Sequence, residues 1–280
     1  MKYCHHHRVS AAAAIFQAVL LGWLTACVPC RAAEKLPAVK EILNRMIERA
    51  SAIARAERGP QYTYDKHALR EQLDENGETI KSEERFYQVR LVAGFPFDRL
   101  VKIQGRELTS DELKQERQKE EKFQQKVSAR NLKKMAAKKE GWVTAQLLER
   151  YQFTVKERVI LNNRPTLVLT FKPREGELPT KNFMDNILNQ VSGTTWVDEE
   201  DADAAKLTST LQGSVSLGLF GVLGSLNQCE FCLERQRMPD GTWVNVRQVV
   251  QINCRKLAST MRFRNTEKSS GFKLDSAASK

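Results

Sequence analysis

Residues that could perform chemistry are sparse in this 280-residue chain. Cys229 and Cys232 have the two-residue spacing of redox and zinc motifs. However, the residues around them alternate between polar and apolar, so a strand would point the two thiols to opposite faces. No second cysteine pair or nearby histidine completes a zinc site. The pattern therefore disfavours both metal and redox chemistry.

Histidine-dependent mechanisms are disfavoured as well. Three of the four histidines are His5, His6 and His7 at the N-terminus, so His67 alone lies in the body of the chain. The glycines of residues 217–224 lie in an apolar run without the Lys-Ser/Thr pair of a phosphate loop. No pair of carboxylates stands out either. We expect no enzyme activity, no cofactor and no metal.

The N-terminus has the pattern of an export signal. Lys2 and Arg8 precede an apolar stretch from Ala11 to Leu24, which is shorter than the roughly 20 residues of a membrane span. We predict a signal peptide over residues 1–26, with a short transmembrane anchor as the alternative. The predicted location is the periplasm of a Gram-negative bacterium.

Residues 24–27, Leu-Thr-Ala-Cys, have the pattern of a bacterial lipobox. The small residues before Cys27 fit a peptidase pocket that needs little side-chain volume. We therefore predict that Cys27 is lipidated and tethers the protein to the outer membrane. The alternative is ordinary cleavage near residues 30–33, which would release a soluble periplasmic protein, although Arg31 fits such a site poorly.

The net charge limits the classes of molecule that the protein could bind. The formal charge is +11, but an exported protein does not meet nucleic acid. Acidic lipid headgroups are the natural partner of such a surface, and a merely soluble basic surface is the alternative.

The body holds three cysteines, Cys229, Cys232 and Cys254, so it is no disulfide scaffold. Residue 229 is expected to face residue 252, which puts Cys254 diagonal to Cys229, and a disulfide between them would need a bulge.

The elements follow from periodicity. Apolar residues recur at three- and four-residue steps over residues 36–57, which predicts an amphipathic helix. From Tyr62 the period is two, typical of strands. A short helix is predicted at residues 183–191, and the polar tail, residues 265–280, is expected to fray. Hairpins are predicted at four turns, namely residues 74–78 with their Asn-Gly pair, 162–165, 199–201 and 239–242.

Residues 107–140 form a charged insertion without Pro or Gly. Residues 109–112, Thr-Ser-Asp-Glu, have helix N-cap chemistry, so the segment is predicted to be helical. Its thin apolar stripe favours a solvated helix. A mobile flap or a basic helix that faces a membrane is the alternative.

The sum is a mainly β protein of about 9–11 antiparallel strands in meander order, each apolar on one face. A sheet of this size must curl. We therefore predict an incomplete antiparallel β-barrel, a curled meander sheet capped by helices. It should occupy residues 36–264.

A further pattern lies in five segments of the body, namely residues 151–153, 163–165, 167–173, 195–198 and 240–244. In these segments the chain resembles the LolA/LolB superfamily of lipoprotein carriers, especially its LolA-like branch. The resemblance runs from about Leu36 to Phe263, apart from the charged insertion. Two features depart from the pattern of the carrier LolA. One is the lipobox, which the receptor LolB shares, and the other is the length and charge of the insertion.

The resemblance implies an apolar cavity that holds the acyl chains of lipoproteins or related lipids in an incomplete barrel. The protein would be a non-enzymatic, monomeric binder, and no reacting group is needed. Ordinary core packing is the alternative for each candidate lining residue. These candidates are Phe86, Val101, Phe153, Val155, Leu167, Leu169, Phe171, Trp196, Val250 and Ile252.

The apolar run of residues 217–226 has two interpretations. It is either a buried turn, or an exposed loop that dips into a membrane surface as the receptor's loop does. The candidate membrane contacts are Leu219, Phe220, Val222 and Leu223. The leading function is lipid or lipoprotein binding. An envelope-sensing or protein-interaction module with the same fold, like the related sensor RseB, is the alternative, and nothing specific supports a hydrolase.

Overall fold

The computed structural model describes residues 35–55, 61–127, 144–217, 224–256 and 259–275. The chain divides into two compact units, residues 1–35 and residues 36–280, and every helix and strand below lies in the second. The predicted signal peptide and Cys27 lie outside the described residues, as do the four candidate membrane contacts at 219–223. None of the described helices is long and apolar enough to cross a membrane.

Helix α1, Val39–Arg55, confirms the amphipathic helix predicted from residue 36. Ile42 and Met46, one turn apart, are about 5% exposed or less, whereas Ile53 near the C-terminal end is 47% exposed. Glu41 in the first turn interacts favourably with the helix dipole. The helix thus presents one short apolar face to the sheet.

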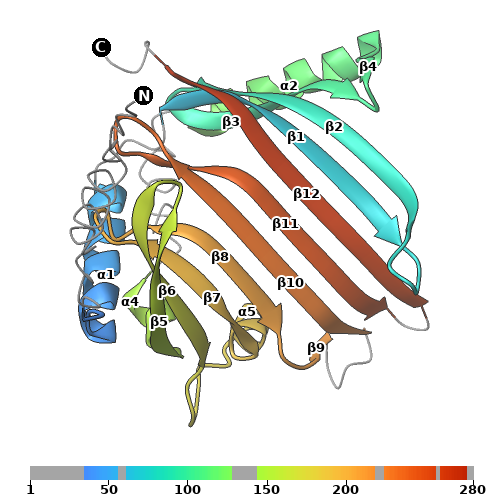
Figure 1. Ribbon diagram of the computed structural model, residues 1–280. Coiled ribbons are helices and arrows are strands. Elements are labelled where there is room, and N and C mark those ends of the chain that lie inside the picture. The colour runs from blue at the N-terminus through green and yellow to red at the C-terminus, as the bar shows by residue number, and fades with distance from the viewer. Residues whose placement is uncertain (1–34, 56–60, 128–143, 218–223, 257–258, 276–280) are drawn as a thin grey trace, which may run out of the picture. The chain divides into compact units, whose positions relative to one another are not determined.

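The twelve strands form one antiparallel sheet (Figure 1). Its order is β4-β3-β2-β1-β12-β11-β10-β8-β7-β6-β5, with β9 paired to β10. The bounds are β1 Tyr62–Leu73, β2 Thr79–Val92, β3 Phe95–Ile103, β4 Arg106–Glu107, β5 Tyr151–Leu161, β6 Arg164–Pro173, β7 Val191–Asp198, β8 Ala204–Leu211, β9 Val215–Leu217, β10 Gly224–Arg237, β11 Trp243–Lys256 and β12 Ser259–Leu274. The four predicted hairpins are all present.

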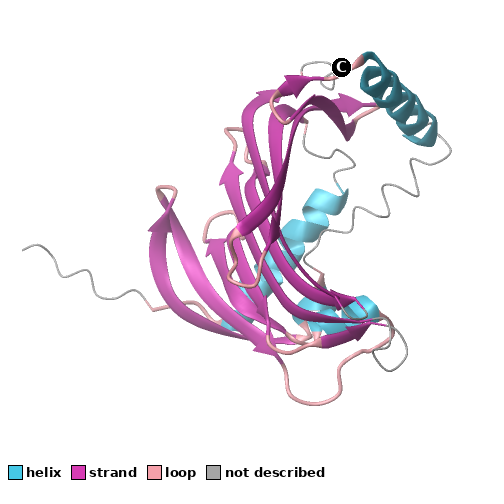
Figure 2. Ribbon diagram, turned by 90° about the vertical axis from the view of Figure 1, so that its right-hand side faces the viewer, coloured by secondary structure: helices cyan, strands magenta, loops and turns pink. Residues whose placement is uncertain are grey.

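The sheet is curled and not closed, as predicted. Its two ends in the strand order are β4 and β5, which do not pair with each other. Figure 2 shows the strands curving around the side on which the central helices lie. Two further short helices, α4 (Ala145–Leu148) and α5 (Phe183–Leu188), belong to the same unit.

The turn of the β1–β2 hairpin has the chemistry that its Asn-Gly pair predicted. Asp74 accepts hydrogen bonds at Oδ1 from the backbone N–H groups of Asn76 and Glu78, at 2.9 and 2.8 Å. Gly77 has φ +85°, a conformation that costs other residues energy because of their Cβ atom. This turn fixes the register of the first hairpin.

Strand β12 contradicts the prediction of a fraying tail from residue 265. It runs to Leu274 and pairs with both β1 and β11. The periodicity of residues 265–271 gave no strand signal because both faces of this stretch are polar. Backbone pairing with β1 and β11 holds it in the sheet, and further along Phe272 packs on Tyr64 of β1 with ring centroids 4.9 Å apart.

Strand β5 also departs from the predicted pattern. Strict two-residue alternation along residues 151–161 would put Arg158 on the face opposite to Phe153 and Val159 on the same face as Phe153. A bulge between Val155 and Glu157 shifts the register, so Arg158 pairs with Leu167 and shares the face of Phe153. A bulge adds one residue to a strand without a composition signal, which is why alternation missed it.

Helix α2, Ser110–Val127, is the described part of the charged insertion. It begins with a capping box, as the N-cap chemistry predicted: Thr109 Oγ1 accepts from the Glu112 N–H, and Glu112 Oε2 accepts from the Thr109 N–H at 2.8 Å. Phe123 packs on Phe97 of β3 with ring centroids 5.1 Å apart. The helix therefore lies on β3 in this structure.

A turn rich in carboxylates, residues 198–203, joins β7 to β8 and is called the acidic turn below. Arginines from four other elements bond to it. Arg164 donates two hydrogen bonds to Asp198, which is fully buried. Arg237 and the Trp243 indole donate to Asp201 at 2.6 and 2.8 Å. The turn thus ties together segments that are distant in the sequence.

Asp201 gives this network a pH dependence. Burial raises the pKa of Asp201, but hydrogen bonds from Arg237 and Trp243 outweigh burial and hold the pKa below its ordinary 3.8. A carboxyl with a lowered pKa stabilises the folded state above its ordinary pKa, and this stabilisation is lost as the pH falls through the folded-state value.

Asp201→Asn should therefore lower the free energy of unfolding at pH 7 by about 1.5 kcal/mol, since it weakens two charge-assisted hydrogen bonds. Urea unfolding as a function of pH measures this. The difference from the unaltered protein should shrink as the pH falls below 3.8. Glu200→Gln, at a side chain that is 63% exposed, is the control and should cost less than about 0.5 kcal/mol. A difference between Asp201→Asn and the unaltered protein that does not depend on pH would contradict this account.

Candidate functional site

The register of the sheet defines the candidate site, which is the face that α1 covers. Residues that pair directly across antiparallel strands point to the same side of a sheet, so pairs can be followed from strand to strand. Each such line of residues is called a row. Three rows cross the face, and we define them from β5 towards β2.

The first row is Phe153, Phe171, Gly193, Ser209, Phe231, Val250, Asn265, Arg70 and Glu83. The second row is Val155, Leu169, Thr195, Leu207, Leu233, Gln248, Glu267, Ala68 and Arg85. The third row is Cys229, Ile252, Phe263, Gln72 and Lys81.

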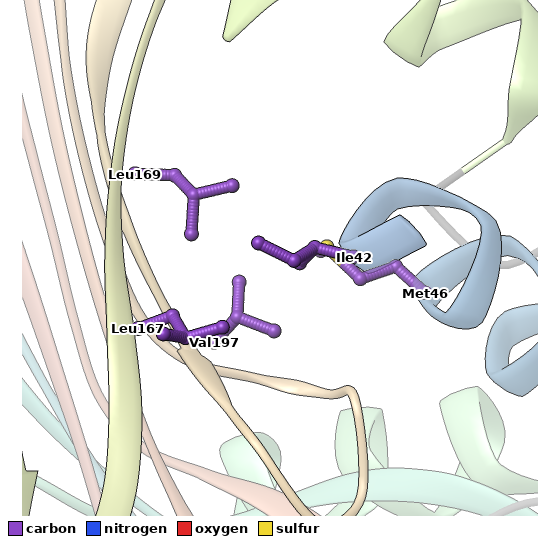
Figure 3. Close-up of a cluster of buried hydrophobic side chains, with 5 residues drawn as sticks. All are labelled: Ile42, Met46, Leu167, Leu169 and Val197. Carbon is purple, nitrogen blue, oxygen red and sulfur yellow. The ribbon is translucent and has the colours of Figure 1, made fainter. Parts of the chain in front are cut away.

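Helix α1 seals the β5–β7 end of this face. Ile42 and Met46 point from α1 onto Leu167, Leu169 and Val197 (Figure 3), and all five side chains are at most 5% exposed. Complete burial of these aliphatic groups contributes about 2 kcal/mol for each side chain. This part of the face is a closed core.

Polar anchors hold α1 in this position. Arg45 donates from Nη2 to the backbone carbonyl of Glu199 at 2.7 Å. Arg49 donates to the backbone carbonyl of Gly241 at 3.0 Å. The acidic turn and the β10–β11 turn therefore fix the angle at which the helix lies on the sheet.

Helix α5 covers a second part of the same face. Its Ile187 packs with Cys229, Ile252 and Cys254 on a buried cluster of Leu211, Val215 and Leu226. A buried ion pair between Arg150 and Asp185 fastens the helix, and the Tyr151 hydroxyl donates to the backbone carbonyl of Leu188 at 2.9 Å. Asn182 caps the helix by accepting from the Asp185 N–H.

Between the two helices the face stays apolar but is only half-buried. We call this part the half-buried strip. A Cβ added at Gly193 would lie 2.0 Å from the Thr208 carbonyl oxygen and 2.8 Å from the Phe171 ring, so only glycine fits at this position. The members of the strip are Phe171, Leu207, Phe231, Val250 and, at its border with the cluster under α5, Ile252.

Seven of the ten candidate lining residues share this face: Phe153, Val155, Leu167, Leu169, Phe171, Val250 and Ile252. The structure brings these seven together. Trp196 pairs with Val168, so its side chain is on the opposite face, where Lys206 lies over its ring. Phe86 is also on the opposite face and stacks on His67. Val101 lies where the pairing of β2 and β3 is irregular.

Leu207, Phe231 and Phe263 are members of the face that sequence reasoning missed. Each is the apolar position of a two-residue alternation, so the signal was present in the sequence. Which of the two faces α1 covers could not be deduced from alternation.

The three cysteines of the body, Cys229, Cys232 and Cys254, are free thiols. Residue 229 faces residue 252, as predicted. Burial raises the pKa of the Cys229 thiol, which lowers its reactivity. Among the described residues no group of three or more His, Cys, Asp or Glu could hold a metal ion.

A cavity of about 870 Å³ lies away from this face, between the β5–β6 turn and the β10–β11 turn. Lys206, which pairs with Trp196, places it on the opposite side of the sheet. Its arginines Arg164, Arg235 and Arg237 are already bonded to carboxylates of the acidic turn. This cavity is therefore a poor candidate for an anion site.

Several solved structures are similar in fold. An outer membrane lipoprotein-sorting protein domain from Vibrio parahaemolyticus has 9% identity and a TM-score of 0.31, over 84% of this chain and 94% of that chain. A LolA superfamily protein from Nitrosomonas europaea has 12% identity and a TM-score of 0.29, over 83% and 93%. The MucA/MucB complex of Pseudomonas aeruginosa contains a chain with 10% identity and a TM-score of 0.22, over 80% and 94%.

No protein-family model matches the sequence, and no curated protein matches it.

Proposed function

We propose that the protein is a non-enzymatic binder of acyl chains, which lie along the half-buried strip beside α1. Lipoproteins or related lipids would supply the chains. The export signal and the lipobox at Cys27 support a place of action in the periplasm, at the surface of a membrane. The contact residues that we propose are those of the strip, because Leu167 and Leu169 on the same face are sealed under α1.

The observation that carries the proposal is the difference in burial along one face. Leu167 and Leu169 are 2% and 0% exposed under α1, whereas Phe231, Val250 and Ile252 on the same face are only partly covered. Partly covered aromatic and branched side chains in a concave sheet leave apolar surface that another apolar group can cover. An acyl chain suits this surface, because each buried CH₂ contributes about 0.8 kcal/mol.

The chemistry of the face agrees with binding and not with reaction. The Cys229 thiol on this face is packed among aliphatic side chains, and burial raises its pKa, which lowers its reactivity. An apolar surface of this kind excludes water from a bound chain.

The test uses two fluorescent probes with the same chain, cis-parinaric acid and its methyl ester. Val250→Glu should weaken the binding of both probes by about tenfold, since it places a charge in the strip and costs at least 1.4 kcal/mol. Fluorescence titration of the purified full chain measures the dissociation constants.

Val249→Glu is the matched control. Val249 neighbours Val250 on β11, is similarly half-buried, and points to the opposite face because it pairs with Thr266 and Cys232. It should change probe binding by less than about twofold. Equal effects of the two variants, or no binding of either probe to the unaltered protein, would contradict the proposal. In the second case, a stoichiometric protein partner without lipid would favour an interaction module.

A further inference from the structure

The three rows change from apolar to polar across neighbouring strands. On β10 and β11 they carry Phe231, Val250 and Ile252, which belong to the half-buried strip. The first row turns polar on β12, where Val250 pairs with Asn265, and the second is polar from Gln248 on β11. The third row stays apolar at Phe263 on β12 and turns polar at Gln72 on β1. One continuous face is thus apolar at one end and polar at the other.

Basic residues predominate in the part of the polar end that lies closest to the half-buried strip. Arg70, Lys81 and Arg85 lie on this face, and all three are exposed. We call these three residues the cationic patch. The carboxylate among them is Glu83, which bonds to Arg85 at 2.5 Å. Further along the same face, Lys66 forms an ion pair with Asp98, and Glu267 lies beside it on β12.

Arg70 lies at the boundary itself. Its guanidinium is 4.9 Å from the ring centroid of Phe263, which in turn pairs with Ile252 of the strip. Within the described residues Arg70 forms no ion pair with a carboxylate. Stacking on an aromatic ring orients a guanidinium and leaves its N–H donors free for an anion.

We propose that the face binds amphiphiles in one orientation, with the acyl chain on the half-buried strip and an anionic headgroup, a carboxylate or a phosphate, on Arg70 of the cationic patch. This inference rests on the proposed function and adds the chemical class and the direction of the ligand. The apolar and cationic parts of the face are next to each other, so one molecule reaches both.

The test compares cis-parinaric acid with its methyl ester at pH 8, where the acid is ionised and the ester is neutral. Arg70→Glu should weaken the binding of the acid by about tenfold and change that of the ester by less than about twofold. Raising the salt concentration should weaken the binding of the acid and leave the binding of the ester unchanged. Displacement of the probe by lysophosphatidylglycerol assigns a phosphate headgroup. Displacement by oleate, without displacement by lysophosphatidylglycerol, assigns a carboxylate. Displacement by inorganic phosphate, which has no acyl chain, would overturn the proposal.

Arg262→Glu is the matched control. Arg262 lies on β12 and makes the same charge change on the opposite face, because it pairs with Asn253 and Leu73. It should leave the binding of both probes unchanged. Equal loss of acid binding in the two variants would show a general charge effect and overturn the inference. If neither probe bound to the unaltered protein, this result would instead contradict acyl binding itself.

Discussion

Replacing Leu169 by alanine should lower the free energy of unfolding by about 3 kcal/mol, the middle of the range for a large buried aliphatic residue. Leu169 has no exposed surface and packs on β6 against α1 and β7. The cavity left behind cannot close easily, because Arg45 and Arg49 hold α1 to two turns of the sheet. Urea unfolding followed by circular dichroism measures the effect.

Ile160→Ala is the control for this variant. Ile160 lies on the neighbouring strand β5, and its side chain is 70% exposed. It should change stability by less than about 0.5 kcal/mol. If Leu169→Ala were equally mild, α1 would not be packed on the sheet as described. The same burial makes Leu169 a poor site for probing ligand contact, since a change there alters the core first.

Breaking the buried ion pair of Arg150 and Asp185 should have an effect of similar size. Both side chains are 9% exposed, and Asp185 also accepts from the Lys181 N–H at 2.9 Å. Arg150→Met should cost about 3–4 kcal/mol, because it leaves a buried carboxylate without its partner. Chemical unfolding of the variant measures this cost.

The double variant Arg150→Met with Asp185→Asn separates the lost pair from the stranded charge. Asparagine keeps an acceptor for the Lys181 N–H and removes the buried charge. The double variant should therefore recover about half of the lost stability or more. A double variant as unstable as Arg150→Met alone would show that the cost comes from lost packing and not from the charge.

The local parts of the fold could be predicted because their signals lie within a few residues. Asn76 and Gly77 specify the first hairpin turn through their tolerance of positive φ. Thr109 and Glu112 specify the start of α2 through a reciprocal pair of hydrogen bonds. Both features depend on short-range chemistry, which a sequence displays directly.

Pairing between distant strands could be predicted only in part. Residue 229 was expected to face residue 252 if Met238 paired with Trp243. In the structure Arg237 pairs with Trp243, and a bulge between Glu234 and Arg235 restores the expected alignment further along. The C-terminal part of strand β12 was missed because residues 265–271 are polar on both faces. Its position depends on neighbours that are distant in the sequence.

The candidate face was predicted as a set of apolar positions and not as a surface. Alternation identified Phe153, Leu169 and Val250, but it also selected Trp196, whose side chain is on the opposite side. The side that a strand buries depends on which face receives the helices. The position of Arg70 next to the apolar strip could not be predicted, because it depends on the pairing of Arg70 with Asn265 on a distant strand.

The bulge of β5 has a consequence for self-association. In the described part of the chain no strand pairs with the outer side of β5, so its backbone groups could template the addition of another copy. The bulge at residues 155–157 breaks the regular spacing of these groups, and Lys156 within it is exposed. A second sheet that docked there would lose hydrogen bonds and bring lysine against lysine. The β5 edge of the curled sheet is thereby protected against edge-to-edge aggregation.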